Sequence, residues 1–249
     1  MGINMDKMRQ KLSQLQGNGN SNKDLFWRPP EGESTIRIVP TPDGDPFKDF
    51  WFHYNVGNNP GFLSPKRNFG DDCPLDRFVR QLFDEGGDEN IKMAKSLMAR
   101  QRFFAPVIVR GEEDKGVRVW GFGKTAYAEL LNLVLNPDYG DITDPEAGTD
   151  LVLKYGKPPG AQFPQTSLTP RRRTSSMMPT NEETAQMLES VPDFSNLFER
   201  KTAAEVQTIL DEFLLSSEDA EDVSQESSKF GSAKEDTNSV DKAYQELLG

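Results

Sequence analysis

Two segments near the start of the chain have the hydrophobic pattern of β-strands. Residues 35–39 alternate polar and apolar positions, and residues 50–54 are almost all aromatic. Alternation and aromatic or β-branched side chains both favour strands. Residues 42–45 between them carry Pro, Gly and two Asp, which is typical of a turn. The pattern predicts two neighbouring strands at the start of a folded body that begins near Leu25.

Apolar residues at helical spacing predict two helices in the next part of the chain. Proline is favoured at the first helical position, and a helix that begins at Pro74 has four apolar residues on one face: Leu75, Phe78, Val79 and Leu82. A second helix over residues 88–101 turns three residues inward: Ile91, Ala94 and Met98. Residues 57–72 are rich in Gly, Asn and Pro, so we expect a loop there.

A β-hairpin is predicted next, with strands at residues 103–109 and 117–122. Side chains alternate across a strand, so Phe103 and Phe104 are expected on opposite faces. The same rule places three residues of the second strand on one face: Arg118, Trp120 and Phe122.

The remaining body contains a helix marked by apolar residues between 127 and 134 and a last strand at 150–155. Residues 156–179 combine several prolines with a run of three arginines, and we expect an extended basic arm. The pairs Thr180/Glu183 and Thr202/Glu205 have the spacing of capping boxes and predict two helix starts.

These patterns divide the chain into four segments. Residues 1–22 form a basic N-terminal arm, in which an amphipathic helix over 5–16 precedes a Gly/Asn hinge. Residues 23–179 form the core with its basic extended segment, residues 180–215 form C-terminal helices, and residues 216–249 form an acidic, Ser-rich tail predicted to be disordered. Short strands interrupted by helices predict an α+β fold, with an open β-barrel of the oligonucleotide-binding kind as its core.

The charge of the chain lies almost entirely at one end. Residues 1–175 carry 24 Lys/Arg against 23 Asp/Glu, a net of +1, and residues 176–249 carry 5 against 17, a net of −12. The near-neutral part also holds 19 of the 24 aromatic residues. An aromatic-rich body with interleaved cations, followed by an acidic tail, favours single-stranded nucleic acid as the ligand.

Several other classes are disfavoured. No stretch approaches the ~18 apolar residues of a membrane span, so no membrane association is expected. The first residues lack the apolar core of a signal peptide. Cys73 is the single cysteine, so an intrachain disulfide is impossible, and a cytosolic setting is expected.

Catalytic motifs are incomplete. Residues 121–125, Gly-Phe-Gly-Lys-Thr, resemble a phosphate-binding loop, but that motif requires a glycine where Arg118 stands. His53 is the single histidine, and no nucleophile-elbow sequence accompanies it. We therefore predict a protein that is not an enzyme and needs no cofactor.

Aromatic residues beside cations form the strongest candidate site, because a ring can stack on a base while a cation contacts its phosphate. The predicted DNA-binding residues are the aromatics Trp51, Phe103, Phe104 and Trp120 and the cations Lys66, Arg67, Arg100, Arg102, Arg118, Lys124, Arg171, Arg172 and Arg173.

The order of these segments resembles the single-stranded DNA-binding (helix-destabilising) proteins of T-even-like bacteriophages. Residues 103–109 stand where that family has an aromatic pair leading a strand. Residues 119–124 match its next strand, including the Phe-Gly-Lys ending, and residues 151–154 match the strand after that. Phe163 lies near a further aromatic of the family and joins the predicted DNA-binding residues through this resemblance.

The resemblance implies a protein that coats single-stranded DNA during phage DNA replication, recombination and repair in the host cytoplasm. It implies that the N-terminal arm contacts a neighbouring protomer through Lys7, Arg9 and Lys11. It also implies that the acidic tail contacts replication and recombination proteins.

One departure from this family concerns a metal. The family has a structural zinc site of one His and three Cys, ending in Cys-Pro-x-Cys. This chain has Cys73, Pro74, Leu75 and then Asp76, with His53 upstream. Two ligands of the zinc-binding type plus a carboxylate are a poor tetrahedral zinc site, so we predict a zinc-free variant.

Two alternative functions stay open at this point. The same stacking surface suits an RNA-binding or translation-control protein, since no motif distinguishes a 2′-hydroxyl. An acidic scaffold that recruits replication partners through its tail is the other alternative.

Overall fold

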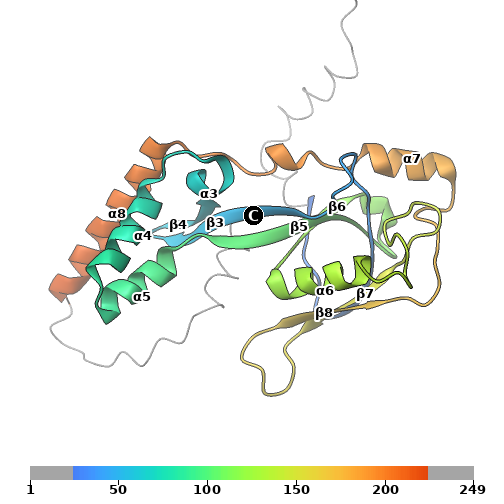
Figure 1. Ribbon diagram of the computed structural model, residues 1–249, viewed down its shortest axis with the longest axis horizontal. Helices are drawn as coiled ribbons and strands as arrows, with labels where there is room; N and C mark the ends of the chain where they lie inside the picture. The colour runs from blue at the N-terminus through green and yellow to red at the C-terminus, as the bar shows by residue number, and fades with distance from the viewer. Residues whose placement is uncertain (1–24, 224–249) are drawn as a thin grey trace, which may run out of the picture.

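A single mixed sheet forms the centre of the protein. The computed structural model describes residues 25–223, with side chains through Ser216 (Figure 1). The sheet has eight strands in the order β1-β6-β5-β2-β7-β8, and β3 and β4 extend from β5. β1 pairs with β6 in parallel, and the other pairs are antiparallel. The strands are β1 (Phe26–Trp27), β2 (Gly32–Ile38), β3 (Lys48–Val56), β4 (Asn59–Leu63), β5 (Arg100–Val109), β6 (Arg118–Phe122), β7 (Leu151–Gly156) and β8 (Gln165–Pro170).

Helices cover the sheet from several sides. The α-helices are α3 (Pro65–Phe69), α4 (Pro74–Glu85), α5 (Asp88–Leu97), α6 (Lys124–Val134), α7 (Asn181–Glu189) and α8 (Ala203–Val223), with short 3₁₀ turns η1 (Glu113–Lys115) and η2 (Phe194–Asn196). Within the described residues, no helix combines the length and the apolar character needed to cross a membrane.

β5 is the strand around which the core is built, because it pairs with β2, β3 and β6. Its sequence is apolar from Phe103 to Val109, and all seven residues are buried. Both faces of a strand can be apolar only when both are covered. On one face Phe103, Ala105 and Val107 join a core that α6 closes with Ala126 and Leu130.

The other face of β5 is covered by the C-terminal part of the chain. Phe104 packs in a cluster with Phe194 and Phe198, and Ile108 packs with Met177 and Met178 beside α7. We call residues 190–202, which link α7 to α8, the crossing segment; Figure 1 shows it running along the sheet from one end of the molecule to the other.

A helical lobe stands at the end of the molecule opposite α7 (Figure 1). β3 continues past the start of β5 and pairs there with β4. The helices α4, α5 and α8 pack over these strands through ten buried residues: Val56, Phe62, Cys73, Leu75, Val79, Leu82, Ala94, Leu97, Val206 and Leu210. The apolar face predicted for the helix that begins at Pro74 is the face that packs here.

Most predicted elements are confirmed. The strands at 35–39 and 50–54 lie in β2 and β3, and β5 and β6 form the predicted hairpin. Both capping boxes are present: Thr180 and Glu183 bond reciprocally, as do Thr202 and Glu205. The α+β class is confirmed, and the sheet is open.

Four predicted details differ from the structure. Residues 57–72 contain β4 and α3 where we expected a loop. α5 ends at Leu97, which leaves Met98 41% exposed. Residues 165–170 form β8 on the edge of the sheet where we expected an extended arm. α8 continues to Val223, so the boundary predicted at Ser216 falls inside a helix. The arm at 1–22 and the tail beyond Val223 lie outside the described residues.

Candidate nucleic-acid interface

Three rings predicted to stack on bases are part of the core. Phe103 is 5% exposed, Phe104 0% and Trp120 1%. The predicted faces are correct, because Phe103 pairs with Phe122 on one face and Phe104 packs on the other. However, α6 and the crossing segment cover those faces, so these rings are not an open stacking surface.

Arg118 is also removed from the candidate surface. Its side chain is buried, and its Nη2 donates to Glu112 Oε2 at 2.7 Å. Hydrogen bonds from Lys115 and then from Arg118 lower the pKa of Glu112 below its ordinary value. This ion pair closes the turn between β5 and β6, and Arg118 has a structural role there.

Trp51 is the tryptophan that remains partly exposed; the chain's other two, Trp27 and Trp120, are buried. The guanidinium of Arg67 lies over its ring, 5.3 Å from the centroid. Asn68 fixes the backbone below: its Nδ2 donates to the Trp51 carbonyl at 2.7 Å, and its Oδ1 accepts from the Trp51 N–H at 2.9 Å. The backbone that carries the ring is therefore held in place before any ligand arrives.

The short helix α3 places these groups, and its sequence explains why it forms. The Ser64 side chain caps it by accepting from the Arg67 N–H, and Pro65 occupies the first turn. Gly70 ends the helix with φ 77°, a conformation that favours glycine. Lys66 and Arg67 are exposed as a result, and neither belongs to an ion pair within the described side chains.

Tyr127 extends the surface on the same face of the sheet. Phe103 lies opposite Asp49 in the register, two residues before Trp51, so Phe103 and Trp51 share a face. Tyr127 of α6 stacks on Phe103 with ring centroids 3.9 Å apart, and it is half-buried. We call the surface formed by Trp51, Tyr127, Lys66, Arg67 and the exposed Lys124 the Trp51–Tyr127 face.

Sequence reasoning missed Tyr127. The pattern placed Tyr127 on the apolar face of its helix. One side of the ring does pack on the core, against Phe103, but the residue is only half-buried. The signal that would have found it is Lys124, which stands three residues earlier and so lies on the same side of the helix.

The other predicted cations lie on separate elements. Arg100 and Arg102 are half-buried on β5, on the face opposite Gln101, which pairs with Trp51. The guanidinium of Arg102 lies close to Gly123, the residue just before α6. A β-carbon at position 123 would be 3.6 Å from Nη1 of Arg102. Phe163 is half-buried in the connection between β7 and β8. Exposed Arg171, Arg172 and Arg173 follow β8, and Arg171 donates to Thr35 Oγ1 at 3.2 Å.

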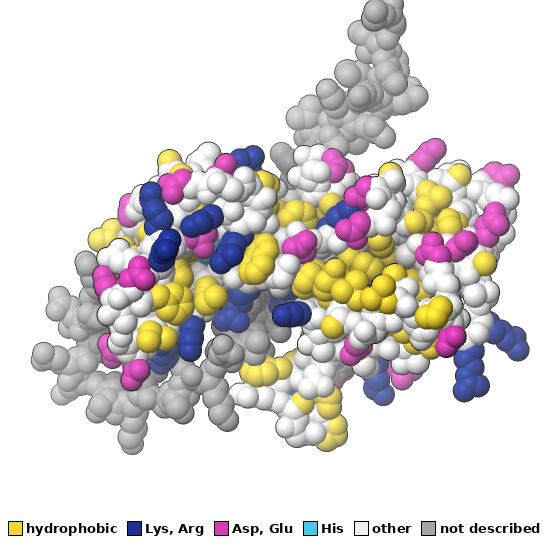
Figure 2. Space-filling model, in the orientation of Figure 1, with side chains coloured by type: hydrophobic (Ala, Val, Ile, Leu, Met, Phe, Trp, Pro, Cys, Tyr) yellow, Lys and Arg dark blue, Asp and Glu magenta, His cyan; other side chains and the backbone are white. Residues whose placement is uncertain are grey.

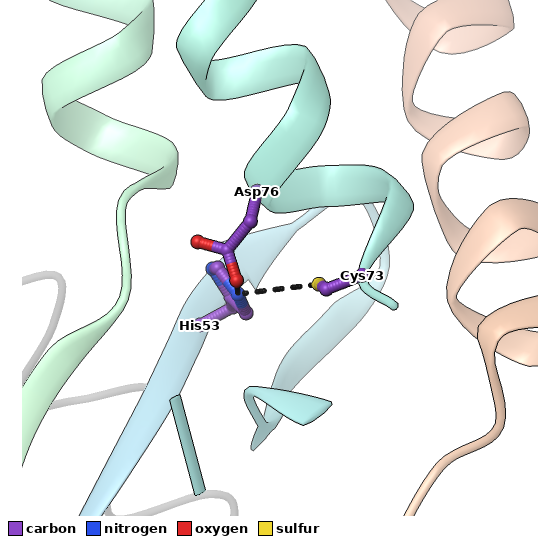
Figure 3. A group of neighbouring side chains, drawn as sticks. All are labelled: His53, Cys73 and Asp76. Atoms are coloured by element: carbon purple, nitrogen blue, oxygen red, sulfur yellow. Dashed lines mark hydrogen bonds and ion pairs between the residues drawn. The ribbon is translucent and has the colours of Figure 1, made fainter. Parts of the chain in front are cut away.

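A buried polar cluster lies next to Ser64, the residue that caps the start of α3. Figure 3 shows His53 of β3, Asp76 of α4 and Cys73 just before α4 converging. His53 Nδ1 donates to the Leu97 carbonyl at 2.8 Å, which leaves Nε2 facing Asp76 Oδ2 at 3.5 Å and Cys73 Sγ at 3.8 Å. Ser64, the cap of α3, donates to Asp76 Oδ2 at 2.9 Å.

The donor set of this cluster differs from that of a structural zinc site. Burial raises the pKa of the Cys73 thiol to about 11, so the thiol is neutral at neutral pH. Three donor atoms lie within 4.8 Å of one another among the described residues, whereas structural zinc takes four and prefers thiolates. The residues present do not fit a closed zinc site.

Compared with known proteins, the sequence matches no protein-family model and no curated protein. The residues of the Trp51–Tyr127 face are therefore the basis for inferring a function.

Proposed function

We propose that the protein binds single-stranded nucleic acid through the Trp51–Tyr127 face, without sequence preference. The proposed ligand is single-stranded DNA. The observation that carries this proposal is the partly exposed Trp51 ring beneath Arg67, beside cations that have no ion-pair partner among the described side chains. Every base has a π-face, so stacking on an aromatic ring tolerates any sequence. Bases in a duplex are already stacked, so they cannot use the ring.

The backbone at Trp51 is preorganised. Asn68 holds it through two hydrogen bonds, so little backbone entropy is lost at this residue when a base stacks. In this proposal Arg67 and Lys66 would contact the phosphates that flank this base, and Lys124 would contact a phosphate beside Tyr127. Asp49 is a nearby acidic group, and Gln101 donates to it at 2.7 Å.

The proposed cellular role rests on the resemblance to the phage single-stranded DNA-binding proteins, and this face supports it. We propose a non-enzymatic protein that coats single strands during phage DNA replication, recombination and repair. Self-association along DNA through the basic N-terminal arm and recruitment of replication proteins through the acidic tail are parts of the same proposal.

The test is a titration with poly(dT), poly(U) and duplex DNA at two salt concentrations, followed by tryptophan fluorescence. Because Trp27 and Trp120 are buried, quenching reports on Trp51. Trp51→Ala lacks this reporter, so its binding is followed by the fluorescence anisotropy of dye-labelled poly(dT), with the parent protein measured in the same way. It should bind poly(dT) roughly 5- to 150-fold more weakly, which corresponds to ~1–3 kcal/mol per stacked base. Phe83→Ala, which truncates a 41%-exposed ring on α4, is the matched control and should change little.

The cations are tested through salt dependence. The double variant Lys66→Ala/Arg67→Ala should reduce the slope of log affinity against log salt by about 1.4, since each phosphate contact on a single strand contributes about 0.7. Arg80→Ala/Lys92→Ala removes two exposed cations of the helical lobe and is the control. Equal affinity for duplex and single strand, or an unchanged affinity in Trp51→Ala, would contradict the proposal. Tighter binding to poly(U) than to poly(dT) would favour the RNA-binding alternative.

A further inference from the structure

The helix α3 carries two cations of the Trp51–Tyr127 face, and it is too short to be stable by itself. It has five residues, whereas an isolated helix shorter than about 12–15 residues is marginal in water. Within α3 only Pro65 is buried, so apolar packing holds the helix weakly. Figure 2 shows Lys and Arg side chains gathered at the end of the molecule where α3 and α4 lie, and like charges repel one another. The position of α3 therefore depends on the polar contacts that attach it.

Ser64, which precedes α3, joins three parts of the structure. Its backbone N–H donates to the Trp51 carbonyl at 2.8 Å. Its carbonyl accepts from the Asn68 N–H at 3.1 Å and from Asn68 Nδ2 at 2.8 Å. Its hydroxyl accepts from the Arg67 N–H at 3.2 Å and donates to Asp76 Oδ2 at 2.9 Å. Ser64 thus connects α3 and β3 to the first turn of α4.

Asp76 determines how the Ser64 hydroxyl is oriented. A serine hydroxyl has one hydrogen to donate, and it accepts through its lone pairs. Because the hydrogen is directed to Asp76, a lone pair faces the Arg67 N–H and caps α3. Ser64 is 0% exposed, so water does not replace either bond. Without the carboxylate, the hydroxyl would be a buried donor that has lost its acceptor, and it would turn toward another acceptor at the expense of the cap.

Asp76 is itself firmly placed. It lies in the first turn of α4, a helix of 12 residues of which four are buried in the lobe. Its Oδ2 is 3.5 Å from Nε2 of His53, whose side chain is also 0% exposed (Figure 3). The other ring nitrogen of His53 donates to the Leu97 carbonyl at 2.8 Å, where α5 ends. The carboxylate that holds Ser64 is therefore fixed to two helices of the lobe.

These contacts connect a buried carboxylate to the candidate binding surface. We infer that Asp76 is a positioning residue for nucleic-acid binding: through Ser64 it fixes α3, and α3 fixes the backbone of Trp51. When α3 is loosened, Asn68 no longer holds that backbone and Arg67 no longer lies over the ring. Both changes weaken the stacking of a base, although Asp76 does not touch the ligand. The inference rests on the proposed function, because it concerns the same face.

A second contact reaches α3 from the crossing segment and is the rival explanation for its position. The guanidinium of Arg200 lies over the Phe69 ring, 4.4 Å from its centroid, and it forms an ion pair with Asp71. Both side chains of that ion pair are exposed. Exposed ion pairs contribute little to stability, so Asp76 should matter more than Arg200 for the position of α3.

The experiment measures the binding of dye-labelled poly(dT) by fluorescence anisotropy. Asp76→Ala should bind about 5- to 10-fold more weakly than the parent protein, which is the size of effect expected when a helix cap is lost. Asp76→Asn keeps an oxygen that accepts from Ser64, so it should bind within about twofold of the parent. Arg200→Ala tests the rival contact and should also stay within about twofold.

Val206→Ala is the control for a general loss of stability. It truncates a buried side chain of the same lobe that takes no part in these hydrogen bonds, and it should leave the affinity unchanged. Ser64→Ala removes the bond to Asp76 from its other side, so it gives the same test if Asp76→Ala does not fold.

Two further measurements separate positioning from a loss of folded protein. Amide hydrogen exchange, followed by NMR without nucleic acid, should become about tenfold faster at Arg67 and Asn68 in Asp76→Ala, relative to the amides of β2. In a Trp51→Ala background, the effect of Asp76→Ala on affinity should shrink to less than about threefold, because the ring that it positions is gone. A loss of folded protein would lower the affinity equally in both backgrounds.

Three results would overturn the inference. They are an affinity equal to the parent's in both Asp76→Ala and Ser64→Ala, equal losses in Asp76→Ala and Val206→Ala, and a larger loss in Arg200→Ala than in Asp76→Ala. Trp51→Ala in the same assay tests the proposed function separately. If Trp51→Ala weakens binding and Asp76→Ala does not, this inference alone fails.

Discussion

Arg37 shows how much structure one buried side chain can organise. Its Nε donates to Asp150 at 2.9 Å, and its other nitrogens reach the carbonyls of Asp144, Gly148 and Ser175. Burial lowers the pKa of Arg37, and the neighbouring carboxylate of Asp150 opposes this effect. Arg37 is a polar position in the alternating segment 35–39, and such a position normally faces solvent. It is buried here because both faces of β2 are covered at this point. Sequence pattern identifies a face, and it does not say what packs on that face.

Arg37→Met should destabilise the protein by about 3–5 kcal/mol, because it leaves buried hydrogen-bonding groups without their partner. The measurement is urea unfolding at neutral pH. Arg172→Met is the control: Arg172 is exposed and belongs to no ion pair described here, so we expect a change within ~0.5 kcal/mol. Equal effects of the two substitutions would contradict this account of Arg37.

The cluster of His53, Cys73 and Asp76 leads to a prediction about metal content. The purified protein should contain no stoichiometric zinc and should keep its melting temperature in the presence of a chelator. The reason is that three donors, only one of them a thiol, do not complete a structural zinc site. Elemental analysis and thermal melts with EDTA are the measurements. One zinc per chain, with unfolding on chelation, would show that another ligand completes the site.

Because of Asp76, the contribution of this cluster to the stability of the fold depends on pH. Burial alone would raise the pKa of Asp76, but hydrogen bonding and charge from His53, with a hydrogen bond from Ser64, lower it below its ordinary value of 3.8. A lowered pKa means that the ionised carboxylate stabilises the fold above about pH 4 and that this contribution is lost as the pH falls through the folded-state pKa.

Asp76→Asn should therefore cost about 1–3 kcal/mol at pH 7 and less at pH 3. Urea unfolding at both pH values measures the difference, with the exposed Asp84→Asn as control. A cost that is the same at both pH values would mean that shape, and not charge, explains the effect.

At the scale of elements, the crossing segment is the least predictable part of the fold. Helices with capping boxes, such as α7, are marked by local sequence and were predicted correctly. The crossing segment has no periodic pattern, and its Phe198 contacts rings from distant strands: Phe26, Phe50, Phe52 and Phe104. The sequence pattern also missed β8. Its half-buried residues alternate with exposed ones, but they include polar residues, as is typical of an edge strand, so no apolar alternation marks it.

Phe198→Ala should destabilise the protein by about 2–4 kcal/mol, since a half-buried ring with four aromatic neighbours is lost. It should also loosen the crossing segment, so limited proteolysis should cut between α7 and α8 sooner than in the parent protein. Phe83→Ala, an exposed ring, is the control for both measurements. Unchanged proteolysis would show that the segment is held by other contacts.

At the scale of the whole molecule, the candidate site was only partly predictable. Trp51, Lys66, Arg67 and Lys124 are on the surface, as the binding prediction requires. Phe103, Phe104 and Trp120 are not, because α6 and the crossing segment cover them. Exposure depends on packing between elements far apart in the sequence, and the pattern of a single strand contains no information about it.

The acidic end of the chain allows a further prediction. Residues 216–249 carry 9 Asp/Glu against 3 Lys. A tethered anion competes with DNA for cations at high effective concentration. Replacing these nine carboxylates by their amides keeps the length of the chain and should raise the affinity for poly(dT) several-fold at low salt.

The gain should shrink at high salt, where the competition is screened. Fluorescence titration at two salt concentrations measures both effects. The amide-substituted chain should also lose binding to replication proteins. If its affinity for DNA and its support of replication both match those of the parent protein, the tail has no regulatory role.

The continuity of β3 has a mechanical consequence. This strand pairs with β5 along residues 48–52 and with β4 along residues 52–56, so one ladder of hydrogen bonds passes from the sheet into the helical lobe. Hinged proteins bend at a few loop residues, and here no loop separates the two parts along β3. If the protein coats single-stranded nucleic acid as proposed, tension along that nucleic acid would therefore load the sheet itself. A row of bound copies would then keep the covered nucleic acid straight and resist its recoil.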